Sequence, residues 1–258
     1  QTVVGKIFVD ERTLGTKINQ DELVASPTNR VVVLQPSYLP WIGYFEQMER
    51  ADKFVFLDDV QYTRRDWRNR NKIRTNEGSS WLTVPVQQKN HYTQLLKETR
   101  IDNSTNWNKK HCSAIKFNYS NAPFFENYYP YFDSIYQKRW DFLLDLCYET
   151  TGYLKEVLNI TTQTFKSSDF SVEGVKAERI LSLCQKMGAT HYLTGALAHD
   201  YLSGINFAKN GVELEYQDYD HPSYSQQYLG FISNLSLVDL LFNAGDKSLA
   251  VLMKWNTN

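Results

Sequence analysis

Two short apolar runs near the start of the chain constrain its fold more than any other feature. Residues 31–34 and 54–57 are each four consecutive apolar residues, and polar residues follow both runs. Such runs are typical of strands buried on both faces of a parallel sheet. A turn with two prolines and a glycine follows the first run, and residues 44–51 have helical spacing. The sequence therefore predicts a strand–helix–strand unit, whose loops lie at the sheet edge where α/β proteins bind ligands.

The remaining segments also alternate between strand-like and helix-like patterns. Strand patterns recur at 81–86, 97–101, 190–194 and 212–216. Helical spacing recurs at 106–119, at 128–158 with a joint at Gly152, at 175–187, after Gly195, at 235–242 and at 249–255. We expect one α/β domain over 30–258, with a mostly parallel sheet, flanking helices and a helical insertion at about 104–165. Residues 1–29 are expected to be an N-terminal extension with a short strand at 6–9.

Charge and motifs exclude several classes of protein. The 258 residues carry 28 Lys and Arg against 29 Asp and Glu, a net charge of −1, which argues against a nucleic-acid binder. We find no membrane span and no signal peptide, and the three widely spaced cysteines suit a reducing cytoplasm. No metal site is predicted, because no CxxC, HxxxH or HExxH pair occurs. GxGxxG, Walker A and GxSxG motifs are also missing.

The ends of the first two predicted strands carry the first candidate site residues. The loop after the first strand contributes Gln35, Tyr38, Trp41 and Tyr44. Asp58 and Asp59 follow the second strand, where one of them would serve as a base or a Mg²⁺ ligand. The alternatives are a tight turn packed by aromatic rings and a loop-capping aspartate.

A basic segment at 62–74 holds five Arg and one Lys and supplies further candidates. We read the stretch around 66–72 as a dense polar loop, in which Arg and Lys would hold a phosphate and Asn amides would hold sugar hydroxyls or a carboxylate. The alternative is a solvated basic loop. The candidates are Trp67, Asn69, Arg70, Asn71 and Lys72.

Two further groups contain histidine. Trp107, Lys110 and His111 have the spacing of one helix face, where a packed polar His is the alternative interpretation. After the alternating strand at 212–216, His221 is the preferred general base because histidine titrates near neutrality. Tyr224 and Gln226 follow it as binding candidates.

These segments resemble the WbqC-like family, which is found with bacterial O-antigen and other surface-polysaccharide genes. The resemblance rests on QPSYLPWIGYF at 35–45, FLDDVQY at 56–62, WRNRNKI at 67–73, the Trp107 helix, APFF at 122–125, HPSYSQ at 221–226 and LSLVDLLFNAG at 235–245. It covers about residues 30–250. One departure is GALAHDY at 195–201, where we expect a more glycine-rich loop, and this weakens a phosphate-binding role for that loop. The resemblance implies a role in decorating lipopolysaccharide glycans, with transfer of glycine or a similar acyl unit to an amino sugar.

Our first hypothesis is an enzyme, a transferase or a ligase, that forms an amide between a small acyl donor and the amino group of a nucleotide-linked amino sugar. His221 would take the amine proton, oriented by Asp58 or Asp59. Arg70 and Lys72 would hold the diphosphate, and the rings of Trp41, Tyr44 and Trp67 would stack on the base or sugar. A reaction through an acyl adenylate would require ATP and Mg²⁺.

The alternative hypothesis is a non-catalytic glycan- or partner-binding module of the same pathway. The 17 Tyr, 14 Phe and 6 Trp suit carbohydrate stacking, although an aromatic-rich core would account for them equally well. Binding without turnover would separate this hypothesis from the first. The oligomeric state is not predicted.

Overall fold

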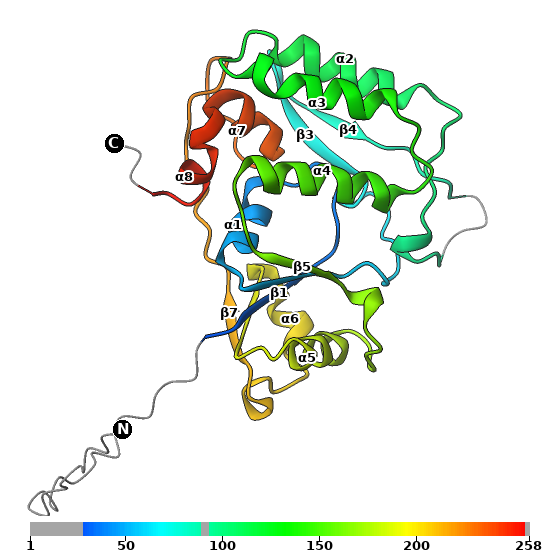
Figure 1. Ribbon diagram of the computed structural model, residues 1–258, viewed down its shortest axis with the longest axis vertical. Coiled ribbons are helices and arrows are strands. Elements are labelled where there is room, and N and C mark those ends of the chain that lie inside the picture. The colour runs from blue at the N-terminus through cyan, green and yellow to red at the C-terminus, as the bar shows by residue number, and fades with distance from the viewer. Residues whose placement is uncertain (1–27, 89–92, 256–258) are drawn as a thin grey trace, which may run out of the picture.

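A five-stranded parallel sheet forms the centre of the molecule (Figure 1). The computed structural model describes residues 28–88 and 93–255, so the strand expected at 6–9 lies outside the described residues. The predicted α/β class with a parallel sheet is confirmed. The strands, in sheet order, are β5 Gln163–Lys166, β2 Lys53–Phe56, β1 Arg30–Leu34, β6 His191–Thr194 and β7 Glu213–Tyr216.

The central position of β1 creates a reversal in the strand order. Counted along the chain, the five strands have the order 3-2-1-4-5. Val32 of β1 is level with Phe54 of β2 on one side and with Leu193 of β6 on the other. The chain builds one side of β1 first and then crosses to the other side. The reversal therefore lies between β1 and β6, and the crevice at such a point is the usual ligand site of an open α/β sheet.

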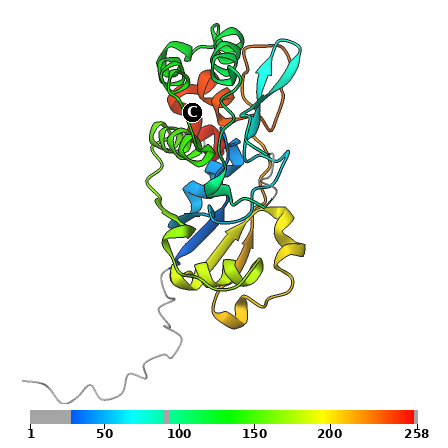
Figure 2. The same cartoon turned by 90° about the vertical axis from the view of Figure 1, so that its right-hand side faces the viewer.

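Both faces of the sheet are covered, which explains the uninterrupted apolar runs. Val32 and Phe54 belong to the larger hydrophobic core, whereas Val33 and Val55 belong to a second core on the other face. Successive strand residues point to opposite faces, so a strand with two covered faces needs apolar residues at every position. Helix α5 (Ala177–Lys186) and the short α6 (His199–Leu202) cover the second face (Figures 1 and 2).

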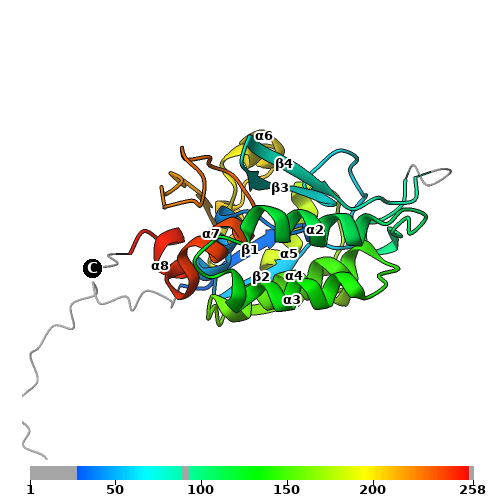
Figure 3. The same cartoon turned by 90° about the horizontal axis from the view of Figure 1, so that it is seen from above.

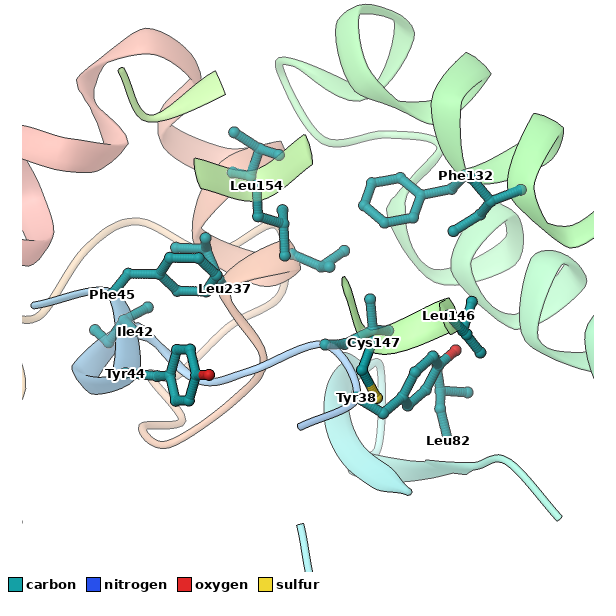
Figure 4. Packing of buried hydrophobic residues seen from close by; sticks show 14 of the residues in the cluster. Tyr38, Ile42, Tyr44, Phe45, Leu82, Phe132, Leu146, Cys147, Leu154 and Leu237 are labelled. Atoms are coloured by element: carbon teal, nitrogen blue, oxygen red, sulfur yellow. The ribbon is translucent and has the colours of Figure 1, made fainter. Parts of the chain in front are cut away.

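The larger core joins the other face of the sheet to a layer of helices (Figure 3). These helices are α1 Ile42–Arg50, α2 Trp107–Tyr119, α3 Phe125–Gln137, α4 Leu143–Val157, α7 Leu237–Ala244 and α8 Ser248–Leu252. Figure 4 shows Phe45 of α1 beside Leu237 of α7, and Cys147 of α4 beside Tyr38. Helices α2 to α4 fall inside the predicted helical segment at 104–165, while the domain boundaries themselves stay a prediction.

A β-hairpin stands where the sequence indicated a polar loop. Strand β3 (Arg70–Thr75) pairs antiparallel with β4 (Gly78–Thr83), so the expected loop ends at Asn69, and the predicted strand at 81–86 begins earlier. Asn71 and Ile73 are buried, while Arg70 and Lys72 are only partly covered. The strand alternation is therefore present, but charged side chains with long apolar stems occupy its outer face and conceal it.

Two other local predictions are wrong. The candidate strand at 97–101 is not a strand, because Lys97 and Glu98 belong to a 3-10 turn at Leu96–Glu98 and Arg100 and Ile101 form only isolated bridges. The joint expected at Gly152 lies instead at 138–142, between α3 and α4, and Gly152 is inside α4.

The other 3-10 turns are Ser167–Asp169, Ala196–Ala198, Ala208–Asn210 and Gly245–Lys247. Within the described ranges, no helix has both the length and the apolar composition that crossing a bilayer requires.

Candidate functional site

A cleft of about 650 Å³ opens where the carboxyl ends of β1, β6 and β7 meet. Gln35 follows β1, Gly195 follows β6, and Gln217 follows β7, and all three line the cleft. This is the point at which the strand order reverses. The lining residues are Leu34, Gln35, Ser37, Pro40, Trp41, Tyr44, Gln47, Trp67, Arg68, Asn71, Gly195, Ala196, Leu197, Gln217, Asp218, Tyr219 and Asn234.

Hydrogen bonds join the two predicted binding segments below this cleft. The Tyr38 amide donates to the Arg68 carbonyl at 3.1 Å, and Arg68 Nη1 donates to the Gln35 carbonyl at 3.1 Å. Leu39 has a φ of 45°, a left-handed conformation that strains a branched residue. Asn71 Nδ2 donates to the Leu39 carbonyl at 2.6 Å and holds that turn in place. The cleft wall is therefore built before any ligand arrives.

Trp41 owes its position to Gly43. A Cβ at residue 43 would lie only 2.3 Å from a carbon of the Trp41 ring, so the ring occupies the space that a side chain would need. The Trp41 ring also meets the Tyr219 ring in a T-shaped arrangement, with the centroids 5.8 Å apart. Gly43 therefore permits a close approach by the indole ring of Trp41, a group of the protein itself.

Three polar atoms of cleft residues are buried without hydrogen-bond partners: Tyr44 Oη, Gln47 Oε1 and Arg68 Nε. Buried polar atoms without partners are rare and costly. The rest of this wall is satisfied, because Gln47 Nε2 donates to Gln217 Oε1 at 2.8 Å, and Gln217 Nε2 donates to the Gly43 carbonyl at 2.8 Å. The unpaired atoms mark the place where a polar ligand would be held.

Among the described residues that line the cleft, Arg68 is the one cation and Asp218 is the one carboxylate. Arg68 Nε lies 3.5 Å from Asp66, and despite the opposing effect of burial the Arg68 charge and other contacts lower the pKa of Asp66. Asp218 is exposed and forms no hydrogen bond or ion pair with any described residue. The cleft thus offers an arginine and an unengaged carboxylate.

The rim of the cleft carries an exposed aromatic pair. Trp67 and Trp81 are 42% and 41% exposed, and their ring centroids are 5.2 Å apart. Arg70 lies over the Trp81 ring at 4.3 Å and the Lys72 ammonium at 5.0 Å. Cations held on an aromatic face suit a ligand that combines a planar ring with phosphates.

Several predicted site residues lie elsewhere and pack inside the fold. Tyr38 is fully buried, and its hydroxyl is hydrogen-bonded to Tyr136 and, at 2.9 Å, to His111 Nδ1. Burial lowers the pKa of His111 to about 4. Trp107 is buried against His111 with ring centroids 5.3 Å apart, whereas Lys110 is exposed. In the structure, Trp107 and His111 are packed residues, which is the alternative interpretation of this helix face.

Asn69, Tyr224 and Gln226 also make contacts within the fold. Asn69 Nδ2 donates to the Val84 carbonyl at 2.7 Å, which secures the start of the hairpin. Tyr224 Oη and Gln226 Nε2 both donate to Asp239 Oδ2 at 2.8 Å, and Tyr119 Oη donates to Asp239 Oδ1 at 2.9 Å. Burial raises the pKa of Asp239 in spite of these donors.

Asp58 and Asp59 tie β2 to the segment after β5. Asp58 accepts hydrogen bonds from Tyr148 and Ser168, Asp59 accepts one from Arg179, and the Ser167 hydroxyl lies within hydrogen-bond distance of both carboxylates. Burial opposes ionisation of Asp58, but the Ser168 hydroxyl and amide and the other donors hold its pKa below the ordinary value. Neither aspartate lines the cleft.

His221 stands behind the cleft wall. Its ring centroid is 6.4 Å from that of Tyr219, which lines the cleft. Nδ1 is hydrogen-bonded to the Pro222 carbonyl at 2.9 Å, and Nε2 has no partner. The orienting contact expected from Asp58 or Asp59 is therefore not made. Burial lowers the pKa of His221, which favours the neutral ring.

The sequence interpretation overlooked part of the cleft wall. Gln47 is one helical turn beyond Gly43, and Arg68 stands between two residues that were selected. Asp218 follows the strand at 212–216 in the way that Asp58 follows β2, so the strand-end argument applied to β7 as well. Among the described residues, no group of three or more His, Cys, Asp and Glu side chains could hold a metal ion.

Comparisons with known proteins agree on one relationship. The model of the WbqC-like protein family matches residues 35–251, which include all the cleft residues except Leu34. The chain is 38% identical over 218 residues to Uncharacterized protein Rv1507c of Mycobacterium tuberculosis (strain ATCC 25618 / H37Rv), covering 84% of this chain and 94% of that protein. No solved structure matches the chain. The chain therefore belongs to the WbqC-like protein family, as its motifs predicted.

Proposed function

We propose that this protein is an enzyme that N-acylates a nucleotide-linked amino sugar in the biosynthesis of a bacterial surface glycan. Membership of the WbqC-like family supports the broader part of this proposal, a role related to polysaccharide or O-antigen biosynthesis. The cleft between β1, β6 and β7 is the proposed site.

The observation that carries the proposal is that Arg68 and Asp218 line the same cleft. Arginine is suited to phosphate, which it binds through two parallel hydrogen bonds. A carboxylate without a partner is suited to an ammonium group. A nucleotide-linked amino sugar carries both groups, the diphosphate and the amine. Its sugar ring would lie between them, beside the unpaired atoms of Tyr44 and Gln47.

The exposed rim supplies the rest of the recognition. In this proposal, the nucleobase stacks on the pair of Trp67 and Trp81, and Arg70 and Lys72 add positive charge along the phosphate path. Stacking on an aromatic side chain contributes about 1–3 kcal/mol per base. Trp41 and Tyr219 form the inner wall against which the sugar packs.

The chemical step needs a proton acceptor close to the amine. The amine nitrogen attacks the carbonyl carbon of an activated acyl donor, the new C–N bond forms, and the leaving group departs with the electron pair of its bond. The amine proton must pass to a base. Asp218 lines the cleft, whereas His221, the base predicted from the sequence, lies one aromatic ring behind it. We therefore assign the proton to Asp218 and retain His221 as the rival base.

The test is incubation with nucleotide-linked amino sugars and acyl donors, with and without ATP and Mg²⁺, followed by mass spectrometry of the products. Asp218→Asn is expected to lower kcat/KM by at least about a hundredfold, the usual contribution of a general base. Asp220→Asn is the matched control, because Asp220 is exposed and paired with Lys254 at 2.8 Å outside the cleft. A full loss in His221→Ala with normal turnover in Asp218→Asn would make His221 the base instead.

A non-catalytic binding module is the second candidate, and one observation favours it. The residues predicted to form a base and its orienting acid, His221 with Asp58 or Asp59, all have other contacts. A binding module would show saturable binding of the nucleotide-sugar, weakened by Arg68→Met, with no product under any donor condition. Product formation by the wild-type protein would exclude this candidate.

A further inference from the structure

A second hollow, of about 330 Å³, lies between α4 and the edge strand β5. It shares no lining residue with the main cleft. Phe56 at the end of β2 and Lys166 at the end of β5 are register partners and both line it. The hollow therefore stands at the carboxyl edge of the sheet too, but on the side of β1 opposite to β6. Its size falls at the lower end of small-molecule sites.

Gly152 is the first sign that this hollow is more than a packing gap. It stands in the interior of α4, where glycine is less favourable than alanine. A Cβ at this position would meet nothing within 4 Å, and its φ is not in the left-handed region. Neither close packing nor backbone conformation requires glycine here. Gly152 lines the hollow, and a side chain at this position would extend into open space beside it.

Thr151 supplies an unpaired donor beside this space. It is 1% exposed and lines the hollow, and its Oγ1 has no hydrogen-bond partner. The neighbouring Thr150 shows the usual solution for a helical threonine, because its Oγ1 donates to the Leu146 carbonyl at 2.9 Å. A buried hydroxyl without a partner is unfavourable, and an acceptor on a ligand would supply the missing hydrogen bond.

The charges on the hollow favour an anion. Lys155 and Lys166 line it, and neither ammonium forms an ion pair with a described residue. The Lys166 ammonium lies 4.6 Å from the centroid of the Tyr148 ring, which is itself fixed by the hydrogen bond from its hydroxyl to Asp58. Asp169 also lines the hollow and offsets one positive charge. Two lysines and one aspartate leave a net charge of +1, which suits a monoanion.

The other residues that line the hollow indicate a second property of the ligand, an apolar body. Phe56, Phe165 and Tyr148 present aromatic surface. Aromatic walls with a few convergent polar groups are the usual composition of a site for a small organic molecule. We propose that this hollow binds a small organic monoanion, a carboxylate with an aromatic or aliphatic body. Its carboxylate would meet Lys155, Lys166 and the Thr151 hydroxyl, and its body would lie against the rings in the space beside Gly152.

The experiment is a ligand-observed NMR titration of the full chain with phenylacetate and with its neutral isostere, phenylacetamide. We expect saturable binding of phenylacetate, with a Kd at least about tenfold lower than that of phenylacetamide. Lys155→Met combined with Lys166→Met should raise the Kd for phenylacetate at least about tenfold. Lys116→Met is the matched control, since the Lys116 ammonium lies over the Tyr129 ring at 5.9 Å outside the hollow.

Substitutions at Gly152 test whether the ligand binds in this hollow. Gly152→Leu should abolish binding by filling the hollow, while Gly152→Ala, which adds one methyl group without a clash, shows that the helix accepts a side chain there. Thermal melts confirm that both variants fold. Equal binding of the two probes, an unchanged Kd in the double lysine variant, normal binding by folded Gly152→Leu, or no saturable binding of phenylacetate would each overturn the proposal. These readouts do not depend on the main cleft or on acyl transfer.

Discussion

At the scale of single residues, His111 shows how surroundings decide the role of a titratable group. Its ring is buried among Tyr38, Trp107 and Tyr136, and a hydrogen bond with the Thr83 backbone offsets the effect of burial on its pKa only in part. A charged imidazolium would gain no counter-ion there. The residue therefore stays neutral and acts as a hydrogen-bonding part of the core. A histidine in this environment makes the folded state sensitive to acid.

We predict that His111 makes the protein less stable as the pH falls from about 6.5 to about 4. Its folded pKa is about 4 and its unfolded pKa is about 6.5, so the unfolded chain binds more protons within this window. The free energy of unfolding contributed by this group is complete above about 6.5 and declines by about 3 kcal/mol by about pH 4. Urea unfolding at several pH values measures the slope.

The variant His111→Gln should reduce this slope, since glutamine cannot take up the proton. His199→Gln is the control, because His199 lies on the surface stacked on Tyr216, outside the core. Equal slopes in the wild-type protein and His111→Gln would contradict the prediction.

At the scale of elements, α1 and α4 each contain a glycine, and the surroundings of the two glycines are opposite in kind. Gly43, in the first turn of α1, faces the Trp41 ring at a distance that no side chain tolerates. Gly152, inside α4, faces open space. The two positions therefore make a matched pair in which the same substitution has opposite effects.

We predict that Gly43→Ala lowers the free energy of unfolding by about 1–3 kcal/mol, because the added methyl group overpacks the Trp41 contact. Gly152→Ala should raise it by about 0.5–1 kcal/mol through helix propensity alone. Chemical denaturation of both variants checks the pair. Since Trp41 lines the main cleft, Gly43→Ala should also weaken nucleotide-sugar binding there. A stabilised Gly43→Ala variant would show that the Trp41 ring moves freely.

At the scale of the whole molecule, Asp58 and Asp59 join the two cores. Tyr148, which donates to Asp58, packs against the larger core, while Arg179, which donates to Asp59, stands on α5 of the second core. The Ser167 hydroxyl lies within hydrogen-bond distance of both carboxylates. A pair that the sequence presents as a catalytic candidate is thus engaged in holding helices from both sheet faces to the end of β2.

We predict that Asp58→Asn lowers the free energy of unfolding by about 3 kcal/mol, since an amide offers one acceptor oxygen where the carboxylate accepts hydrogen bonds on both oxygens. Nucleotide-sugar affinity and turnover of the folded variant should stay at the wild-type level. Asp141→Asn, which removes an exposed pair with Arg139, should change the stability by less than about 1 kcal/mol. Normal stability with lost turnover in Asp58→Asn would restore its catalytic assignment.

The local sequence was sufficient for the class of the fold and for one edge of the site. Apolar runs on β1 and β2 require burial on both faces, and a strand that ends in polar residues places them at the carboxyl edge of the sheet. This reasoning located Gln35, Trp41 and Tyr44, which line the cleft. It failed for β3, because Arg70 and Lys72 disguise a half-buried strand as a polar loop.

The tertiary structure decides which polar residues line the cleft and which are engaged within the protein, because partners far apart in the chain compete for the same groups. Asp58 meets Ser168 across 110 residues, His111 meets Tyr38 across 73 residues, and Tyr224 meets Asp239 across 15 residues. None of these contacts leaves a local pattern in the sequence. Asp218 has no such partner among the described residues, and Arg68, which also donates to the Gln35 carbonyl, lines the same cleft, because the order of strands places β7 and the segment before the hairpin around the crevice beside β1. A residue's type and spacing set what chemistry it is capable of, and the packing of distant segments sets whether that chemistry is available to a substrate.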